Sequence, residues 1–171
     1  MKLVILDRDG VINHDSPHFV KSQQEWVPLP GSVEAIDLLK QRHITVAVAT
    51  NQSGIARGLL SLDTLRAIHN RIPADHIFYC PHGPDDTCFC RKPKPGLLIQ
   101  ALKKYAIAPQ DACMIGDSMR DIQAAIAAQC EPILVLTGNG EKTWADNKSQ
   151  LKGIQVYADL MDCIQQRFMK E

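Results

Sequence analysis

The sequence has no excess charge of either sign, no long apolar run and no charged leader. Lys and Arg together number 19, as do Asp and Glu, so the formal net charge is zero. A neutral chain argues against a broad nucleic-acid footprint. No apolar run approaches the ~18 residues of a membrane span, and no charged segment precedes an apolar one at the start. We therefore expect a cytoplasmic protein without nucleic-acid or membrane partners.

Internal repeats and low-complexity linkers are also absent. The chain has 171 residues, of which 45% are hydrophobic, and this predicts a single domain over residues 1–171 with an ample core. Six cysteines could form disulfides. The clustering of three of them between residues 80 and 90 instead favours metal binding in a reducing compartment.

Short apolar runs alternate with amphipathic stretches along the chain. This order predicts an α/β fold of three layers, with a doubly wound, Rossmann-like and mostly parallel sheet. The segment from Asn13 to Pro28 lacks periodicity and is expected to be a loop or a short hairpin. The predicted strands are Leu3–Leu6, Ile44–Ala49, His76–Tyr79, Ala112–Ile115, Pro132–Val135 and Ile154–Tyr157. The predicted helices are Ser32–Arg42, Leu62–Arg71, Gly96–Tyr105, Met119–Ala128, Thr143–Lys148 and Leu160–Phe168.

Two aspartates directly follow the first predicted strand. In extended chain, residues two apart project to the same side, so the carboxylates of Asp7 and Asp9 are expected to converge. They would meet at the carboxyl edge of the sheet, where open α/β folds bind ligands. Two carboxylates this close need a cation or a shared proton, and Mg²⁺ prefers such oxygen ligands. The alternative is a polar strand end with a turn at Gly10.

Two further segments carry groups suited to phosphate. The segment Thr50–Gly54 follows the second predicted strand and offers hydroxyl and amide groups to phosphate oxygens, or it caps a turn into a helix. The basic turn Arg91–Gly96 combines the fork of Arg91 with the point charge of Lys92. Its alternative is a solvated surface turn.

A third acidic position follows the fourth predicted strand. Asp117 could complete a cation site with Asp7 and Asp9. Asp121, one turn into the next helix, could support that site, but we favour a place at the positive helix end.

Three thiols and one imidazole lie within eleven residues: Cys80, His82, Cys88 and Cys90. This set matches a closed tetrahedral zinc site with a structural role. Residues 80–90, the zinc loop, lead directly into Arg91, so zinc would fix the segment that carries the basic pair. A disulfide or unrelated buried thiols are the alternatives. The remaining cysteines lie in apolar contexts and are expected in the core: Cys113, Cys130 and Cys163.

With these residues in view, the chain resembles the haloacid dehalogenase superfamily of phosphatases over nearly its whole length. The order of its signature is Asp7-x-Asp9, then Thr50, then Lys92, then Gly116-Asp117 with Asp121. Within the superfamily the chain is most similar to the family of heptose bisphosphate phosphatases. The segments that carry this likeness are Asp7–Asn13, Thr50–Gly58, the zinc loop and Arg91–Gly96.

The resemblance implies phosphoryl transfer from a small-molecule sugar bisphosphate, at the 7-phosphate of a heptose 1,7-bisphosphate. Asp7 would be the nucleophile and Asp9 the general acid and base. Mg²⁺ would be bound by Asp7, the backbone carbonyl of Asp9, and Asp117, while Thr50 and Lys92 would hold the phosphoryl oxygens. The implied fold has no large cap domain, and a monomer is expected. The residues expected to bind substrate are Asp15, Ser16, Pro17, His18, Asn51, Gln52, Ser53, Arg57, Arg91 and Ser118.

Three other interpretations stay open at this point. The zinc-containing histidinol-phosphate phosphatases have a similar Cys-x-His-x₅-Cys-x-Cys spacing, although the segments Val11–Asn13 and Ser53–Arg57 favour the heptose enzymes. A receiver-like signalling domain would also be α/β with an acceptor aspartate, but it would not need a zinc loop. A zinc-stabilised module without catalysis is the third, and phosphate release would exclude it.

Overall fold

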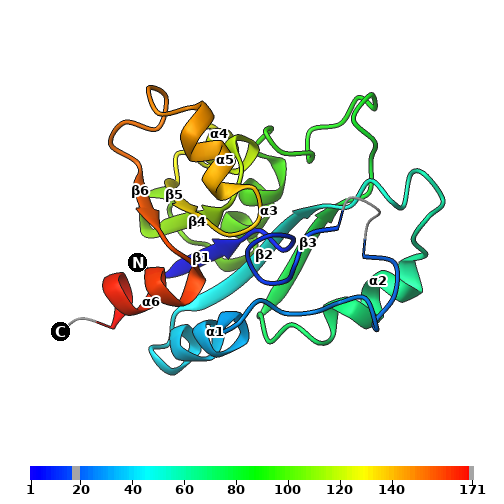
Figure 1. The fold of residues 1–171 in the computed structure, drawn as a ribbon, viewed down its shortest axis with the longest axis horizontal. Helices are drawn as coiled ribbons and strands as arrows, with labels where there is room; N and C mark the ends of the chain where they lie inside the picture. The colour runs from blue at the N-terminus through cyan, green and yellow to red at the C-terminus, as the bar shows by residue number, and fades with distance from the viewer. Residues whose placement is uncertain (17–19, 170–171) are drawn as a thin grey trace.

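The structure is a computed structural model that describes residues 1–16 and 20–169. Six strands form one parallel sheet in the order β3-β2-β1-β4-β5-β6 (Figure 1). The chain winds outward from β1 to β3, returns to β4 beside β1, and winds outward in the other direction. Ligands bind at such a reversal in open α/β sheets. The strand bounds are β1 Leu3–Leu6, β2 Thr45–Asn51, β3 His76–Cys80, β4 Ala112–Gly116, β5 Glu131–Val135 and β6 Gln155–Tyr157.

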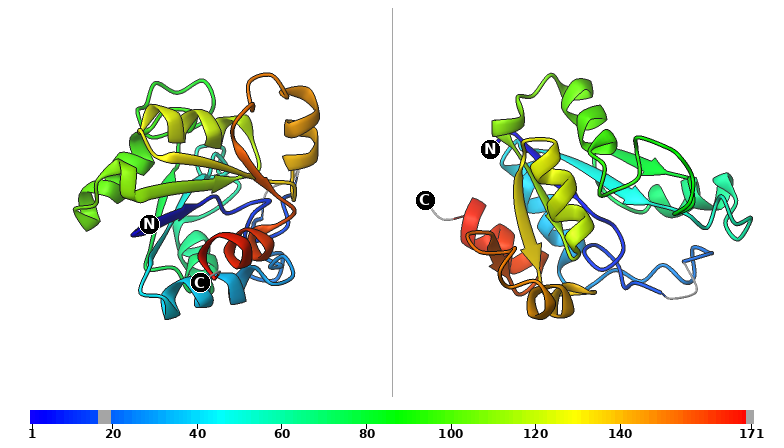
Figure 2. Two further views of the ribbon diagram at one scale, coloured as in Figure 1. Left: turned by 90° about the vertical axis from the view of Figure 1, so that its left-hand side faces the viewer. Right: turned by 90° about the horizontal axis from the view of Figure 1, so that it is seen from above.

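Helices cover both faces of the sheet, which gives three layers (Figure 2). Helices α1, α2 and α6 pack on one face, and α3 and α4 pack on the other. Helix α5 lies beside α4 and β5. The helix bounds are α1 Ser32–Gln41, α2 Leu62–His69, α3 Gly96–Tyr105, α4 Met119–Ala127, α5 Gly140–Asp146 and α6 Leu160–Phe168, with a short 3₁₀ turn η1 at Pro109–Asp111. The predicted doubly wound, three-layer fold is confirmed.

The apolar run of β1 explains why a strand buried on both faces lies at the centre. Val4 and Leu6 pack into the core on the α1 side, whereas Leu3 and Ile5 pack toward α3 and α4, and all four are fully buried. The register pairs Leu6 with Val48 of β2 and with Ile115 of β4. The residues that follow these strands therefore lie at the same edge of the sheet.

Most predicted bounds are within a residue or two of the observed ones. Strand β2 extends to Asn51, beyond the predicted end at Ala49, because Thr50 and Asn51 still pair with β3. Helix α5 begins at Gly140, three residues before the predicted start at Thr143. Between Asn13 and Pro28 the described residues form a loop closed by an isolated antiparallel bridge between these two residues. Among residues 1–16 and 20–169, no helix is long and apolar enough to cross a membrane.

Candidate active site

A buried lysine connects three elements at the carboxyl edge of the sheet. Nζ of Lys92 forms ion pairs with Oδ1 of Asp7 at 2.8 Å and with Oδ1 of Asp121 at 2.6 Å. Asp7 follows β1, Asp121 lies in the first turn of α4, and Lys92 precedes α3. Asn51 at the end of β2 fixes the lysine backbone: its Nδ2 donates to Lys92 O, and Lys92 N donates to its Oδ1, both at 3.0 Å. The packing of three segments therefore sets the position of the ammonium group.

The charges at this edge perturb one another strongly. Burial raises the pKa of Asp7 to about 8, with further increases from the charges of Asp121 and Asp117, although the charge of Lys92 opposes the shift. Burial also raises the pKa of Asp117 to about 6, against hydrogen bonds from Asn139 that lower it. Burial alone would lower the pKa of Lys92, but the carboxylates of Asp121 and Asp7 raise it above its ordinary value. The site therefore concentrates desolvated negative charge around one ammonium group.

Three carboxylates fit a hard divalent cation. Carboxylate oxygens of Asp7, Asp117 and Asp121 all lie within 4.8 Å of one another. Oxygen donors of this kind are the ligands that Mg²⁺ prefers. Asp121 also has the expected place at the start of α4, where its Oδ2 accepts from N and Oγ of Ser118 at 3.1 and 2.7 Å. Its ion pair with Lys92 was not predicted.

The carboxylate of Asp9 lies outside this group of three, but it lines the same cavity as Asp7. A tight turn follows β1, in which the carbonyl of Arg8 accepts from the backbone N–H of Ile12 at 2.8 Å and from that of Asn13 at 3.2 Å. The carboxylate of Asp9 accepts hydrogen bonds from the buried side chain of Arg8.

A cavity of about 180 Å³ opens at this edge of the sheet. Pro17 and His18 lie outside the described residues, and the exposed Arg57 is not among the described residues that line the cavity. The residues that were predicted from the sequence and line the cavity are Asp7, Asp9, Asp15, Ser16, Thr50, Asn51, Gln52, Ser53, Arg91, Lys92, Asp117 and Ser118. The lining residues that were not predicted as site residues are Arg8, Val20, Arg120, Asp121 and Asn139.

The predicted residues Gln52 and Arg91 form hydrogen bonds with groups beside the cavity. Nε2 of the buried Gln52 donates to Oδ2 of Asp9 at 3.0 Å and to Oγ1 of Thr50 at 2.9 Å. NH1 of Arg91 donates to the carbonyl of His82 at 3.1 Å, which ties the arginine to the zinc loop. These contacts order the side chains that surround the cavity.

The segment after β5 contributes to the site, which was not predicted from the sequence. Asn139 donates to Oδ2 of Asp117 from its backbone N at 2.7 Å and from Nδ2 at 3.2 Å. Gly138 has φ +57°, and a Cβ there would lie 2.2 Å from the same oxygen of Asp117. The signal was available, because Thr137-Gly138-Asn139-Gly140 is one more polar cluster directly after a buried strand.

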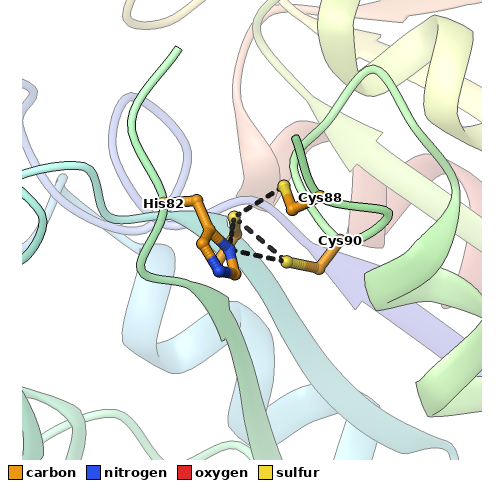
Figure 3. Close-up of side chains that lie close together, drawn as sticks. His82, Cys88 and Cys90 are labelled. Atoms are coloured by element: carbon orange, nitrogen blue, oxygen red, sulfur yellow. Dashed lines mark hydrogen bonds between the residues drawn. The ribbon is translucent and has the colours of Figure 1, made fainter. Parts of the chain in front are cut away.

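The cysteine and histidine side chains of the zinc loop converge as predicted. His82, Cys88 and Cys90 point toward a common centre (Figure 3). Cys80 Sγ lies 3.2 Å from Cys90 Sγ and 3.8 Å from Cys88 Sγ, and Nδ1 of His82 lies 3.4 and 3.3 Å from the sulfurs of Cys80 and Cys90. A tetrahedron with Zn–S bonds of about 2.3 Å has edges of roughly 3.8 Å, so the ligand set fits zinc. The other cysteines are buried in the core, as predicted: Cys113, Cys130 and Cys163.

Comparison with known proteins agrees with this geometry. Residues 89–163 match the family model described as "HAD-hyrolase-like". A D-glycero-beta-D-manno-heptose-1,7-bisphosphate 7-phosphatase of Pseudomonas putida is 54% identical over 84% of this chain and 87% of the relative. The protein of the same name from Bordetella bronchiseptica is 51% identical over 94% of both chains. The chain belongs to the family of D-glycero-beta-D-manno-heptose-1,7-bisphosphate 7-phosphatases.

Solved structures of family members have the same fold. The crystal structure of the B. bronchiseptica D,D-heptose 1,7-bisphosphate phosphatase, complexed with magnesium and phosphate, superposes with a TM-score of 0.94 and 48% identity over the full length of both chains. The crystal structure of the Burkholderia thailandensis enzyme of the same name gives a TM-score of 0.72 at 37% identity, and the match covers 99% of this chain and 100% of the thailandensis chain. The fold is therefore that of the haloacid dehalogenase superfamily.

Proposed function

We propose that the protein is a Mg²⁺-dependent phosphatase that hydrolyses the 7-phosphate of D-glycero-D-manno-heptose 1,7-bisphosphate. This reaction belongs to the synthesis of nucleotide-activated heptose for the lipopolysaccharide core. The observation that carries the proposal is the buried ion pair of Asp7 and Lys92 beside Asp117, in a member of this family. The names of the relatives support the beta anomer as substrate.

In the first step, a carboxylate oxygen of Asp7 attacks the phosphorus of the 7-phosphate. An O–P bond forms to Asp7, the bond from phosphorus to O7 of the heptose breaks, and Asp9 gives its proton to O7. Oδ1 of Asp7 accepts from the backbone N–H of Arg8 at 2.7 Å and pairs with Lys92, so the nucleophile is held in one orientation. Lys92 and the hydroxyl of Thr50 bind the phosphoryl oxygens, whose charge must be stabilised in the transition state.

In the second step, Asp9 takes a proton from water while the water oxygen attacks the phosphorus of the aspartyl phosphate. The bond between Asp7 and phosphorus breaks, which releases inorganic phosphate and restores both carboxyl groups to their starting states. Splitting the hydrolysis in this way is nucleophilic catalysis. Asp9 lies at the wall of the cavity with 22% of its side chain exposed, so water can reach it.

Two metals complete the proposal. Asp7, Asp117 and the backbone carbonyl of Asp9 would hold Mg²⁺, which supplies positive charge for the phosphoryl oxygens when bound. Cys80, His82, Cys88 and Cys90 would hold a structural zinc ion. The four protein ligands leave no open position for chemistry, and the loop that they close leads into Arg91 and Lys92.

We further propose that Asp15, Ser16, Ser53, Arg91 and Ser118 recognise the sugar and its second phosphate from the cavity wall. Asp15 and Ser16 belong to the segment that also includes Pro17 and His18, which keep their predicted roles. Arg57, Asn51 and Gln52 also remain predicted substrate contacts. The substrate is the single partner that the proposal needs, and a monomer remains a prediction.

A phosphate-release screen tests the proposal directly. Purified protein would be assayed with heptose 1,7-bisphosphate, histidinol phosphate and an aryl phosphate, each with Mg²⁺ and with a chelator of Mg²⁺. We expect the bisphosphate to be the best substrate, with the 1-phosphate retained and activity lost without Mg²⁺. Faster hydrolysis of histidinol phosphate would overturn the proposed substrate, and no phosphate release from any compound would overturn the proposed activity. Metal analysis of the same sample should find about one zinc per chain.

A further inference from the structure

The carboxylate of Asp9 is held by three side chains. Its Oδ1 accepts from Nε of Arg8 at 3.0 Å, from NH2 of Arg8 at 2.8 Å and from Nδ2 of Asn13 at 2.9 Å. Its Oδ2 accepts from the same NH2 at 2.9 Å and from Nε2 of Gln52 at 3.0 Å. Both oxygens therefore have donors in fixed directions, and the carboxylate has little freedom to rotate.

Arg8 supplies three of these five hydrogen bonds, and its charged side chain is buried. Its side chain is only 1% exposed, although a guanidinium group is costly to bury without partners. Adjacent residues in extended chain point to opposite faces, but the turn after β1 brings the side chain of Arg8 beside Asp9. The fork of an arginine can bond both oxygens of a carboxylate at once, which a lysine cannot do.

The charges of Arg8 and Asp9 both affect the pKa of His69 on α2, which Arg8 lowers and Asp9 raises. NH1 of Arg8 and Nε2 of His69 are both buried and have no hydrogen-bond partner among the described residues. A neutral imidazole does not repel the guanidinium, and its ring nitrogen can accept from it. The side chain of Arg8 is therefore enclosed by protein.

We propose that Arg8 is a positioning residue that fixes the orientation of the Asp9 carboxyl group for proton transfer. The inference rests on the proposed function, in which Asp9 is the general acid and base. General acid–base catalysis requires the carboxyl group to lie within hydrogen-bond reach of the leaving oxygen and later of the attacking water. Arg8 meets that requirement through its hydrogen bonds to the Asp9 carboxylate.

The two chemical steps depend differently on Asp9 when the substrate is an aryl phosphate. A nitrophenolate is a weak base and leaves without a proton, so phosphorylation of Asp7 does not need Asp9 to be oriented. Hydrolysis of the aspartyl phosphate still needs Asp9 to activate water. A protein with a misoriented Asp9 should therefore release one equivalent of nitrophenol quickly and then turn over slowly.

Arg8→Lys keeps the charge and removes the fork, so it is the variant to test. We expect kcat for heptose 1,7-bisphosphate to fall roughly 100-fold, a typical share for general acid–base catalysis, while KM changes little. With p-nitrophenyl phosphate, rapid mixing should show a burst of about one nitrophenol per chain that the unmodified protein lacks. Arg66→Lys, a matched change at a side chain that is 70% exposed on α2, should behave like the unmodified protein.

The result that overturns the proposal is an Arg8→Lys protein with unchanged kcat, or one that loses the phosphorylation and hydrolysis steps equally. If Arg8→Lys does not melt cooperatively, Arg8→Gln, which replaces the fork by a single amide donor, must give the same burst; its absence would refute the orientation argument. The proposed substrate can fail separately. In that case the unmodified protein hydrolyses the aryl phosphate but not the bisphosphate, and the burst test still applies.

Discussion

At the scale of single residues, the site is organised by the balance of charge around Lys92. The carboxylates of Asp7, Asp117 and Asp121, when ionised, carry one charge each, and the ammonium of Lys92 neutralises one of them. Two negative charges remain, which is the charge that a divalent cation compensates. The raised pKa values of Asp7 and Asp117 express the cost of ionising both without that cation. The site is therefore incomplete until Mg²⁺ binds.

Replacement of Asp7 by asparagine separates catalysis from folding. An amide is a poor nucleophile, so we expect Asp7→Asn to lower kcat at least 1000-fold, in the range typical for loss of a nucleophile. The change also removes a negative charge that burial and two carboxylates disfavour, so the melting temperature without Mg²⁺ should be unchanged or higher. Phosphate release and thermal melting measure the two effects.

The matched control is Asp63→Asn, the same chemical change at a side chain that is 93% exposed on α2. It should leave both quantities unchanged. Retention of a tenth of the unmodified activity in Asp7→Asn would show that the nucleophile is another residue.

At the scale of elements, the zinc loop between β3 and α3 connects the proposed zinc ligands to the residues proposed to bind phosphate. Cys80 ends β3, and the loop returns through Cys88 and Cys90 to Arg91 and Lys92 before α3 begins. Two hydrogen bonds from side chains to backbone carbonyls hold the return: Lys94 Nζ donates to Cys88 O at 2.5 Å, and NH1 of Arg91 donates to His82 O. The geometry of the loop therefore determines where the basic pair lies.

Loss of one loop cysteine should weaken stability and substrate handling together. Zinc binding contributes to folding free energy, so we expect Cys88→Ser to lose zinc and to melt several degrees lower. We also expect kcat/KM for the bisphosphate to fall about tenfold or more, because Arg91 and Lys92 lose their fixed position. Atomic emission for zinc, thermal melting and initial rates measure these effects. Cys130→Ala, a change at a core thiol outside the loop, should keep its zinc. A Cys88→Ser protein with normal zinc content would contradict the assignment of the ligands.

The elements that the sequence predicted well share one property: their signal is local. The apolar run of β1 and the zinc-loop spacing each depend on a few neighbouring residues, and the structure confirms both the strand and the cluster. The hydrogen bonds from Arg8, Asn13 and Gln52 to the Asp9 carboxylate could not be predicted, because they depend on the turn after β1 and on the packing of β2 beside it. The role of Arg8 was missed for the same reason, since a buried arginine between two aspartates looks like a solvated charge in the sequence.

At the scale of the whole molecule, the parallel sheet gathers residues that are far apart in the chain. The hydroxyl of Thr137 donates to the carbonyl of Gly10 at 2.7 Å across a separation of 127 residues. Such a contact depends on the strand order, which places β4 between β1 and β5. The alternation of strands and helices and the meeting of the ends of β1, β2 and β4 were predicted, but no sequence signal was used to place the end of β5 beside them. For that reason the hydrogen bond from Asn139 N to Oδ2 of Asp117 was not predicted.

The same packing makes global stability depend on a histidine. Burial, and secondly the charge of Arg8, lower the pKa of His69 to about 4 from an ordinary value of 6.5, although Asp9 opposes the shift. Between these two pH values the unfolded chain binds a proton at His69 and the folded protein does not. Stability contributed by neutral His69 is therefore present above pH 6.5 and is lost as the pH falls toward 4. The shift corresponds to about 3 kcal/mol.

The raised pKa values of Asp7 and Asp117 act in the opposite sense over part of this range, because the folded protein holds their protons more tightly than the unfolded chain does. A comparison of the unmodified protein with His69→Gln removes this contribution, because both proteins contain Asp7 and Asp117. His69→Gln keeps a polar acceptor of similar reach and cannot gain a proton. Urea unfolding at pH 7, 6, 5 and 4 should show the unmodified protein losing stability relative to His69→Gln, by about 3 kcal/mol in total at pH 4. A difference between the two proteins that stays constant from pH 7 to pH 4 would show that His69 accepts a proton as readily in the folded protein as in the unfolded chain.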